Sequence, residues 1–300
     1  MKYHMRSCQF EAESKYLTLS LPDSTRRLDD TNALRARMRE DGFLFIRGLH
    51  DPGDVRQARQ DILEIMGRNG KLDPAAEVAH GMAHRSSTEV ATSSVRGREH
   101  LKTESLRHVV YGPRIMEFFD RFLGGEAMSY NFQWLRTTGP GAGSTIHYDV
   151  VYMGRGTKQV FTCWTPLGRI TPEMGPLAIC LGSNRWDDVI RTYGKTDVDR
   201  DHTCGYFSRD PAELVYRFGG RWATDTFQPG DAVILSMFIM HASLTNSTQK
   251  YRISCDTRYQ LASEPVDARW AGKTPRMHDA FWHPDTELEP IEVSRSKWGV

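Results

Sequence analysis

From about residue 126 onward, the chain is a succession of short apolar segments. β-Branched and aromatic residues cluster within these segments, and Gly, Pro, Asn and Asp cluster between them. This pattern predicts six or more short β-strands that form a sandwich or barrel of the jelly-roll type. The predicted strands are MSYNFQWLRT (128–137), TIHYDVVYM (145–153), KQVFTCWTPL (158–167), GPLAICLGS (175–183), DAVILSMFIM (231–240) and YRISCDTRYQL (251–261).

The first 125 residues have a different pattern, in which helical spacing alternates with one apolar run. Residues 29–41 are predicted to form a polar, arginine-bearing helix, residues 115–123 have helical spacing, and the apolar run 42–49 indicates a strand. Another helix is predicted to begin at Asp51-Pro52, because an N-cap residue followed by proline is typical of a helix start. Residues 70–104 are polar and aperiodic, which is typical of a functional loop or lid.

These patterns predict one domain over residues 1–300, in the mainly β (α+β) class. Its helical N-terminal part (1–125) flanks a jelly-roll core (126–260). Residues 184–226 are predicted to be an irregular insertion in that core. Residues 261–300 are predicted to be a polar tail whose tryptophans pack against the core; these are Trp270, Trp282 and Trp298.

Charge and cysteine content narrow the class of protein. Lys plus Arg (39) nearly balances Asp plus Glu (38), which argues against nucleic-acid and membrane-surface partners and favours a small-molecule substrate. Five widely spaced cysteines show no metal or disulfide spacing, so we expect reduced thiols in a cytoplasmic protein. The first residues lack an apolar leader pattern, and no run approaches a membrane span. Both a monomer and a homodimer fit the sequence.

One tripeptide in the predicted core carries candidate metal chemistry. Non-haem iron oxygenases bind their metal with two imidazoles and one carboxylate on one face of the ion. His147-Tyr148-Asp149 supplies two such ligands, and on a strand the positions i and i+2 project to the same side. A second His-x-Asp, His283-Pro284-Asp285, contains a proline and lies near the chain end, so we predict a surface role for it.

Residues that follow the first tripeptide complete an ordered set. A series of predicted strands leads to His241 at the end of an apolar run, and Arg252 follows on the next predicted strand. His241 is therefore the candidate third ligand, and the candidate metal site consists of His147, Asp149 and His241.

The region from about 127 to 260 resembles the phytanoyl-CoA dioxygenase family of Fe(II)/2-oxoglutarate oxygenases. The resemblance rests on a series of short motifs in the family order, and Asp41-Gly42-Phe43 is similar to the family's opening. The motifs are His147-x-Asp149, Trp164-Thr165-Pro166-Leu167, Gly175-Pro176-Leu177, Gly182-Ser183-Asn184, Pro229-Gly230-Asp231, His241-Ala242-Ser243 and Arg252.

The resemblance implies a double-stranded β-helix, of the jelly-roll or cupin-like kind, that uses Fe(II), 2-oxoglutarate and O2. It implies that a small-molecule substrate, of natural-product or acyl type, is hydroxylated while succinate and CO2 are released. Arg252 suits the distal carboxylate of 2-oxoglutarate, because a guanidinium is a permanent, planar cation. Further candidates for that pocket are Ser243, Trp164, Gln133 and Thr145. Related halogenases replace the carboxylate with a small residue, so Asp149 argues against halogenation.

The polar segment 70–104 offers candidate substrate contacts. His80 and His84 are four residues apart, but glycine lies between them and no acidic third ligand is evident, so a second metal site is not predicted. With Arg98, they are candidates for contacting substrate from the predicted lid.

Two other functions stay open on the sequence alone. A cupin-like metal enzyme could use the same three ligands without 2-oxoglutarate, and a binding or sensing module could retain the fold without catalysis. Arg252 argues against the first alternative. The intact ligand set together with Arg252 argues against the second.

Overall fold

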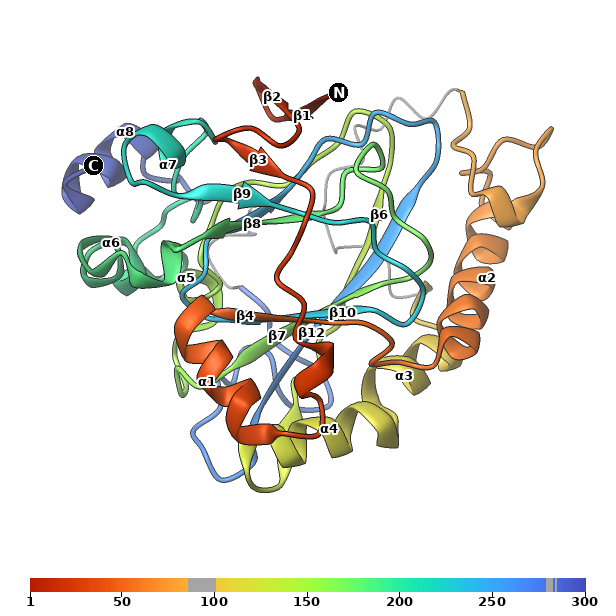
Figure 1. Cartoon of the computed structure of the whole chain (residues 1–300), viewed down its shortest axis with the longest axis horizontal. Coiled ribbons are helices and arrows are strands. Elements are labelled where there is room, and N and C mark those ends of the chain that lie inside the picture. The colour runs from red at the N-terminus through yellow and green to blue at the C-terminus, as the bar shows by residue number, and fades with distance from the viewer. Residues whose placement is uncertain (86–100, 279–282, 284) are drawn as a thin grey trace.

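Two β-sheets face each other at the centre of the chain, and helices cover the outer face of the larger one (Figure 1). The structure, a computed structural model, describes residues 1–85, 101–278, 283 and 285–300. The larger sheet has the order β4 (Phe43–Ile46), β10 (Ala232–Ser236), β7 (Phe161–Pro166), β12 (Arg252–Leu261) and β5 (Ala127–Ser129), and β6 (Trp134–Thr138) also pairs with β12. The smaller sheet has the order β11 (His241–Ser243), β8 (Leu177–Leu181), β9 (Arg221–Ala223) and β3 (Leu17–Thr18).

This arrangement confirms the predicted jelly-roll class. All strand pairs within the larger sheet are antiparallel, and strands far apart in sequence lie side by side, as with β4 and β10. A separate hairpin, β1 (Lys2–Met5) with β2 (Cys8–Glu11), lies near the smaller sheet. The N-terminal hairpin and β3 were not predicted.

Side chains along β4 alternate between the two faces of the larger sheet, one of which faces the smaller sheet and the other the helices. Phe43 and Phe45 pack between the sheets, whereas Leu44 and Ile46 pack outward against helices. Successive side chains of a strand point to opposite faces, so an uninterrupted apolar run such as this one is buried on both sides. The space between the sheets is therefore the interior of the barrel.

Four N-terminal helices cover the outer face of the larger sheet. Three match the predicted helices closely, and their bounds are α1 (Thr31–Asp41), α2 (Pro52–Arg68) and α4 (Pro113–Leu123). As predicted, Asp51 caps α2, and its side chain accepts hydrogen bonds from the backbone of Gly53 and Asp54. The fourth, α3 (Glu104–Tyr111), packs beside α2 and was not predicted.

Part of the predicted lid is attached to the barrel. Among the described residues of segment 70–104, Leu72 pairs with Ala83 and Met82 pairs with Lys250, and a short 3₁₀ turn spans Val78–His80. The segment is thus held beside the start of β12. Residues 86–100 lie outside the described part of the chain.

The predicted strand 145–153 is wrong. Ile146 and His147 make only isolated bridges, and the chain then turns into the short helix α5 (Val150–Met153). Tyr148 and Val151 are both fully buried there, because the segment passes through the core instead of lying on a sheet with one open face. Apolar runs this short do not distinguish a strand from a buried helical turn.

Two other predicted strands are divided in the structure. Residues 128–137 form β5 and β6 with a break between them, and residues 231–240 form only β10 before a turn leads into β11. That turn allows His241 to join the smaller sheet, opposite the sheet that contains β10.

Residues 184–226 are more regular than predicted. They contain β9, which joins the smaller sheet, together with α6 (Asp187–Arg191), α7 (Glu213–Tyr216) and 3₁₀ turns at Ser183–Arg185 and Tyr193–Lys195. Trp222 of β9 is fully buried. Tertiary pairing with β8 and β3 organises a segment whose local pattern shows no period.

Two tryptophans of the C-terminal segment are buried, as predicted, but the segment also contains a helix and is not only a polar tail. Trp270 and Trp298 are buried in the same core cluster, and α8 (Ile291–Trp298) ends the chain. Trp282 lies outside the described residues. His283 and Asp285 are exposed, which agrees with the surface role predicted for the second His-x-Asp.

Several of the short motifs turn out to shape the backbone near the candidate ligands. Ser183 Oγ accepts a hydrogen bond from the backbone N–H of Met240, the residue before His241. Asp231 pairs with Arg47 at 2.7 Å and so joins the turn before β10 to the end of β4. Gly175 has a positive φ of 70°, at a point where the backbone of residues 244–246 passes closely. These motifs therefore hold the turn before His241, the entry to β10 and the entry to β8.

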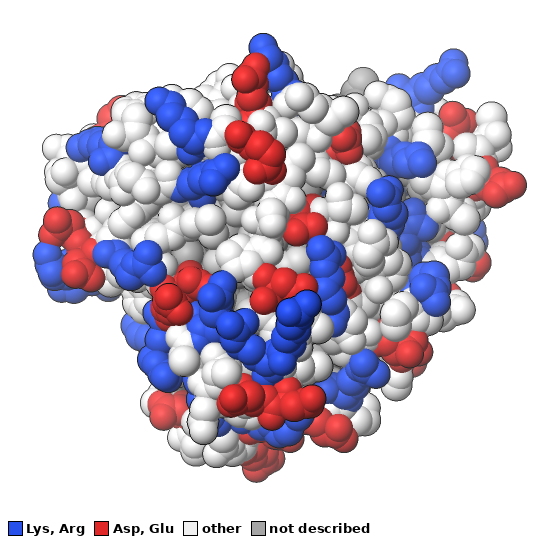
Figure 2. Space-filling model, in the orientation of Figure 1, with Lys and Arg blue, Asp and Glu red and all other residues white. Residues whose placement is uncertain are grey.

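Charged side chains of both signs are mixed over the face seen in Figure 2. This distribution matches the near-neutral net charge of the sequence and shows no single-sign surface on that face. Within the described residues, none of the helices combines the length and apolar character that a membrane crossing requires.

We predict that Gly175→Ala destabilises the fold strongly. A Cβ there would lie 2.6 Å from both Asn246 N and Leu244 O, in a left-handed backbone. The backbone conformation costs roughly 1–2 kcal/mol, and the overpacking adds about 1–3 kcal/mol. Gly141→Ala is the control, since Gly141 also has a positive φ but nothing within 4 Å. Urea unfolding should show the larger loss for Gly175→Ala; equal losses would contradict the steric argument.

We also predict a pH-dependent contribution from His50, which follows β4 and lies beside Thr165 with Nε2 and Oγ1 3.1 Å apart. Burial, aided by the positive charge of Arg114, lowers the pKa of His50 to about 4. The unfolded chain therefore takes up a proton below its ordinary pKa while the folded chain does not. This stability is present above about pH 6.5 and is lost as pH falls toward 4.

The measurement is the free energy of unfolding of wild type and His50→Gln between pH 7 and pH 4.5. Because each pH unit in this window is worth about 1.4 kcal/mol, the wild type should lose about 2–3 kcal/mol more than the variant. Parallel pH profiles for the two proteins would show that His50 titrates normally in the fold.

Candidate active site

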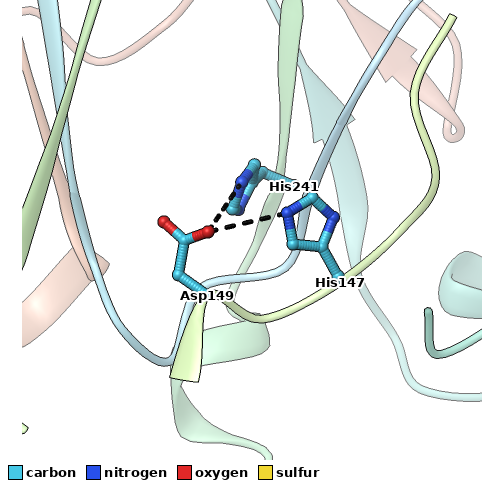
Figure 3. Close-up of side chains that lie close together, drawn as sticks. All are labelled: His147, Asp149 and His241. Atoms are coloured by element: carbon cyan, nitrogen blue, oxygen red, sulfur yellow. Dashed lines mark ion pairs between the residues drawn. The ribbon is translucent and has the colours of Figure 1, made fainter. Parts of the chain in front are cut away.

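Three side chains from two distant segments meet between the sheets. His147 and Asp149 come from the segment before α5, and His241 begins β11 (Figure 3). The backbones of His147 and His241 pair directly, each N–H donating to the other's carbonyl at 3.2 Å. One donor atom from each residue lies within 4.8 Å of the other two, so the predicted set is brought together.

Asp149 lies on a helical turn, whereas the sequence predicted that it shares a strand with His147. Its backbone is helical, with φ −65° and ψ −28°, and it directly precedes α5. The N–H of Val150 donates to the carbonyl of Met237 in the turn between β10 and β11. A helical turn, rather than strand alternation, therefore aims Asp149 at the two imidazoles, and the prediction of a shared strand face is corrected.

Both histidines are oriented in the same manner. His147 Nδ1 lies 2.9 Å from the carbonyl of Thr145, and His241 Nδ1 lies 3.0 Å from the carbonyl of Ile239. Because a carbonyl only accepts, Nδ1 carries the proton and Nε2 keeps its lone pair. The Nε2 atoms of His147 and His241 lie 3.6 and 3.8 Å from Asp149 Oδ1.

These distances fit a common metal ion. The carboxylate oxygen lies 3.6 and 3.8 Å from the two imidazole nitrogens, and all three donor atoms lie within 4.8 Å of one another, so a small movement of the side chains would bring them to one ion. Two neutral imidazoles and one carboxylate are the ligand set of non-haem Fe(II) sites that keep open positions. The residues present therefore fit iron.

The electrostatics of the site favour the ligand forms of its side chains. Burial lowers the pKa of His241 to about 4, and the neighbouring His147 contributes in the same direction. Burial alone would raise the pKa of Asp149, but the positive charge of Arg258 opposes this effect, and the pKa lies well below its ordinary value. At neutral pH the site offers a neutral His241 and an ionised Asp149.

A pocket extends from the two imidazoles into the barrel, with walls from both sheets. Arg252, Ser243 and Trp164, all predicted to contact 2-oxoglutarate, line it. The remaining lining residues are Arg136, Ser144, Thr162, Leu177, Leu235, Ala242 and Asp256. The pocket therefore connects the candidate metal ligands with the predicted carboxylate-binding arginine.

Hydrogen bonds hold Arg252 and Ser243 in this wall. Arg252 Nη1 donates to Ser254 Oγ at 2.8 Å, and its Nη2 donates to Thr138 Oγ1 at 2.7 Å. Ser243 Oγ accepts from the backbone N–H of Ser144 at 2.8 Å, so its own hydrogen can be donated to a ligand. Both side chains are buried and have a defined direction.

The structure does not bring every predicted residue to this pocket. Gln133 is buried but does not line it, and Thr145 contributes its carbonyl to His147 while its side chain does not line it. His80 is largely exposed, and neither it nor His84 lines the pocket. Arg98 lies outside the described residues. The roles assigned to these residues stay predictions.

Sequence reasoning missed Thr162, Arg136, Asp256 and Arg258. Arg258 Nη2 lies 3.4 Å from Asp149 Oδ1, and Thr162 Oγ1 donates to Asp149 Oδ2. Arg136 Nε donates to Asp256 at 2.6 Å on the pocket wall. A signal was present: polar residues occupy alternate positions of β12, on the face that carries Arg252, and these are Ser254, Asp256, Arg258 and Gln260.

Comparisons with known proteins agree with this geometry. The sequence pattern of the phytanoyl-CoA dioxygenase (PhyH) family matches residues 38–254. The chain is 29% identical over 251 residues to a 1-deoxypentalenic acid 11-beta-hydroxylase of Streptomyces exfoliatus, with 80% of this chain and 85% of the relative covered. The hydroxylase of that name from Streptomyces arenae is 25% identical over 253 residues, with the same coverage.

Solved structures share the fold. EctD from S. alaskensis, in its apoform, has a TM-score of 0.55 and 18% identity, with 92% of each chain covered. The epimerase SnoN, in complex with Fe3+, alpha ketoglutarate and nogalamycin RO, has a TM-score of 0.53 and 17% identity, with 87% of this chain and 93% of that chain covered. Since the family pattern covers most of the chain, the chain belongs to the phytanoyl-CoA dioxygenase family of 2-oxoglutarate-dependent non-haem iron oxygenases.

Proposed function

We propose that this oxygenase binds Fe(II) through His147, Asp149 and His241, and that it hydroxylates a small natural-product molecule. The observation that carries the site assignment is the continuous pocket from the two imidazoles to Arg252. A bidentate keto acid on the metal would place its distal carboxylate toward that arginine. A guanidinium is suited to this role because it is always charged and presents two parallel N–H groups.

Each residue in the proposal has a distinct task. The two imidazoles and Asp149 hold the metal on one face, Arg252 and Ser243 bind the distal carboxylate, and Trp164 packs beside the co-substrate. When bound, iron, 2-oxoglutarate and O2 supply the oxidising chemistry, with succinate and CO2 as co-products. The chain's own contribution is to orient these groups and keep bulk water away from them.

The substrate class is proposed from the relatives. Two curated relatives are named as hydroxylases of 1-deoxypentalenic acid, which supports a small natural-product molecule and hydroxylation as the outcome. Substrate contacts are proposed on segment 70–104, with His80, His84 and Arg98 as candidates, and Gln133 and Thr145 remain candidates near the co-substrate.

A monomer or homodimer in the cytoplasm is proposed. The five cysteines are all unpaired, as expected for reduced thiols.

The test uses metal-free protein mixed anaerobically with Fe(II) and 2-oxoglutarate. Chelation of the metal by a keto acid gives a weak visible charge-transfer band, which we expect for wild type. His241→Ala should lose the band because one metal ligand is missing. Arg252→Ala should retain it only at much higher 2-oxoglutarate concentration, by roughly 100-fold or more, because a charge-assisted bidentate contact is lost.

The sequence contains a matched control in its second His-x-Asp. His283→Ala removes an exposed imidazole from the same tripeptide pattern and should leave the band unchanged. Wild-type protein that binds Fe(II) but gives no band with 2-oxoglutarate would overturn the co-substrate assignment. It would instead favour a cupin-like metal enzyme that works without a keto acid.

A further inference from the structure

The two oxygens of Asp149 have different surroundings. Oδ1 faces the Nε2 atoms of His147 and His241, at 3.6 and 3.8 Å (Figure 3). Oδ2 accepts a hydrogen bond from Thr162 Oγ1 of β7. The carboxylate therefore has one oxygen directed to the metal position and one held by the barrel wall.

Arg258 of β12 provides the charge that balances this carboxylate. Its Nη2 lies 3.4 Å from Oδ1 and 3.5 Å from Oδ2 of Asp149. The guanidinium carbon lies 3.8 Å from the centre of the Trp134 ring, which is within the range of a cation–π interaction. Only 2% of Arg258 is exposed, so these contacts are screened little by solvent.

Arg258 is costly to bury at this position. Among the residues that the structure describes, its Nε and Nη1 have no hydrogen-bond partner. Burying N–H groups without acceptors opposes folding, and the effect is larger for charged groups. The contacts that offset this cost are those with Asp149 and with the face of Trp134, so the placement of Arg258 is specific to the metal-binding carboxylate.

We propose that Thr162 and Arg258 are positioning residues for Asp149: Thr162 holds Oδ2 and leaves Oδ1 for the metal, and Arg258 balances the charge of the carboxylate and holds it in place. Engaging Oδ2 with Thr162 prevents both oxygens from turning to the metal. Binding through one oxygen would leave positions on the metal open for the keto acid and O2. This inference rests on the proposed function, because it requires the triad to bind the metal.

The C-terminal segment supports this arrangement from behind. The ring of Trp134 lies 4.9 Å from that of Trp270, centre to centre, and Trp270 is almost fully buried. Trp270 thus backs the ring on which Arg258 lies. The order of contacts runs from Trp270 through Trp134 and Arg258 to Asp149.

The first test replaces Thr162 and measures Co(II) binding to metal-free protein, together with the visible Co(II) spectrum. Thr162→Val has nearly the same shape without the hydroxyl. We expect roughly 10-fold weaker Co(II) binding, in the range found for residues that orient metal ligands, and a changed spectrum as the carboxylate rotates. Thr162→Ser restores the hydroxyl and should bring both properties back toward wild type.

Thr165→Val is the matched control on the same strand. Thr165 is also fully buried, but its hydroxyl lies beside His50 on the opposite face of β7. We expect this variant to lose stability without a change in Co(II) affinity or spectrum. A general effect of removing a buried hydroxyl would instead appear in both valine variants.

The second test compares Arg258→Met with Arg258→Lys. Removing a positive charge near the metal would by itself strengthen metal binding, so a net loss of roughly 10-fold in Arg258→Met would report lost positioning. Arg258→Lys keeps the charge and should recover part of the affinity. Arg295→Met is the control, because Arg295 also pairs with a carboxylate, Glu213, and neither of these residues lines the pocket.

The outcomes separate this inference from the proposed function. Wild-type protein that fails to bind Co(II) or Fe(II) would overturn both. Wild-type binding with unchanged affinity and spectrum in Thr162→Val would overturn the positioning role of Thr162 alone. A wild-type Co(II) spectrum in Arg258→Met, together with binding at least as tight as wild type, would overturn that of Arg258. If Arg258→Met does not fold, Arg258→Lys decides: unchanged affinity and spectrum despite the altered donor geometry would overturn the role of Arg258.

Discussion

An ionised carboxylate inside a protein needs compensating charge and hydrogen bonds. Asp149 is such a carboxylate, buried at the centre of the barrel. It is 1% exposed, yet its pKa lies well below the ordinary value, because the positive charge of Arg258 lies beside it. Neighbouring residues supply the hydrogen bonds and fix the geometry around this carboxylate. Thr162 takes the second oxygen, and the backbone pairing of His147 with His241 keeps both imidazoles in place.

Strand β12 connects the two ends of the site. Its alternate side chains point into the barrel, so a single strand presents Arg252 at the end proposed for the co-substrate and Arg258 beside the candidate ligand Asp149. Its other side chains, such as Ile253 and Tyr259, pack outward against the helices. Packing of the outer face therefore fixes the position of the inner face, because a shift of one residue would exchange the two faces.

Different parts of the fold build different parts of the site. Strands from both sheets line the pocket that contains the imidazoles, whereas turns and motif glycines set where those strands begin. The C-terminal segment, which has the composition of a polar tail, brings Trp270 against Trp134 and so takes part in holding the site. Segment 70–104 is attached beside β12 through pairings such as Met82 with Lys250.

The sequence by itself determined most of the strands, three of the four N-terminal helices and the three candidate metal ligands, which the fold then brings together. Strand alternation and helix caps are local properties, and the ordered motifs contain the candidate ligands directly. Tertiary structure alone decided how Asp149 turns, why β9 is a strand and which groups neutralise the carboxylate. Thr162 and Arg258 lie 13 and 109 residues from Asp149 along the chain, and they meet it only because β7 and β12 pair within the folded sheet.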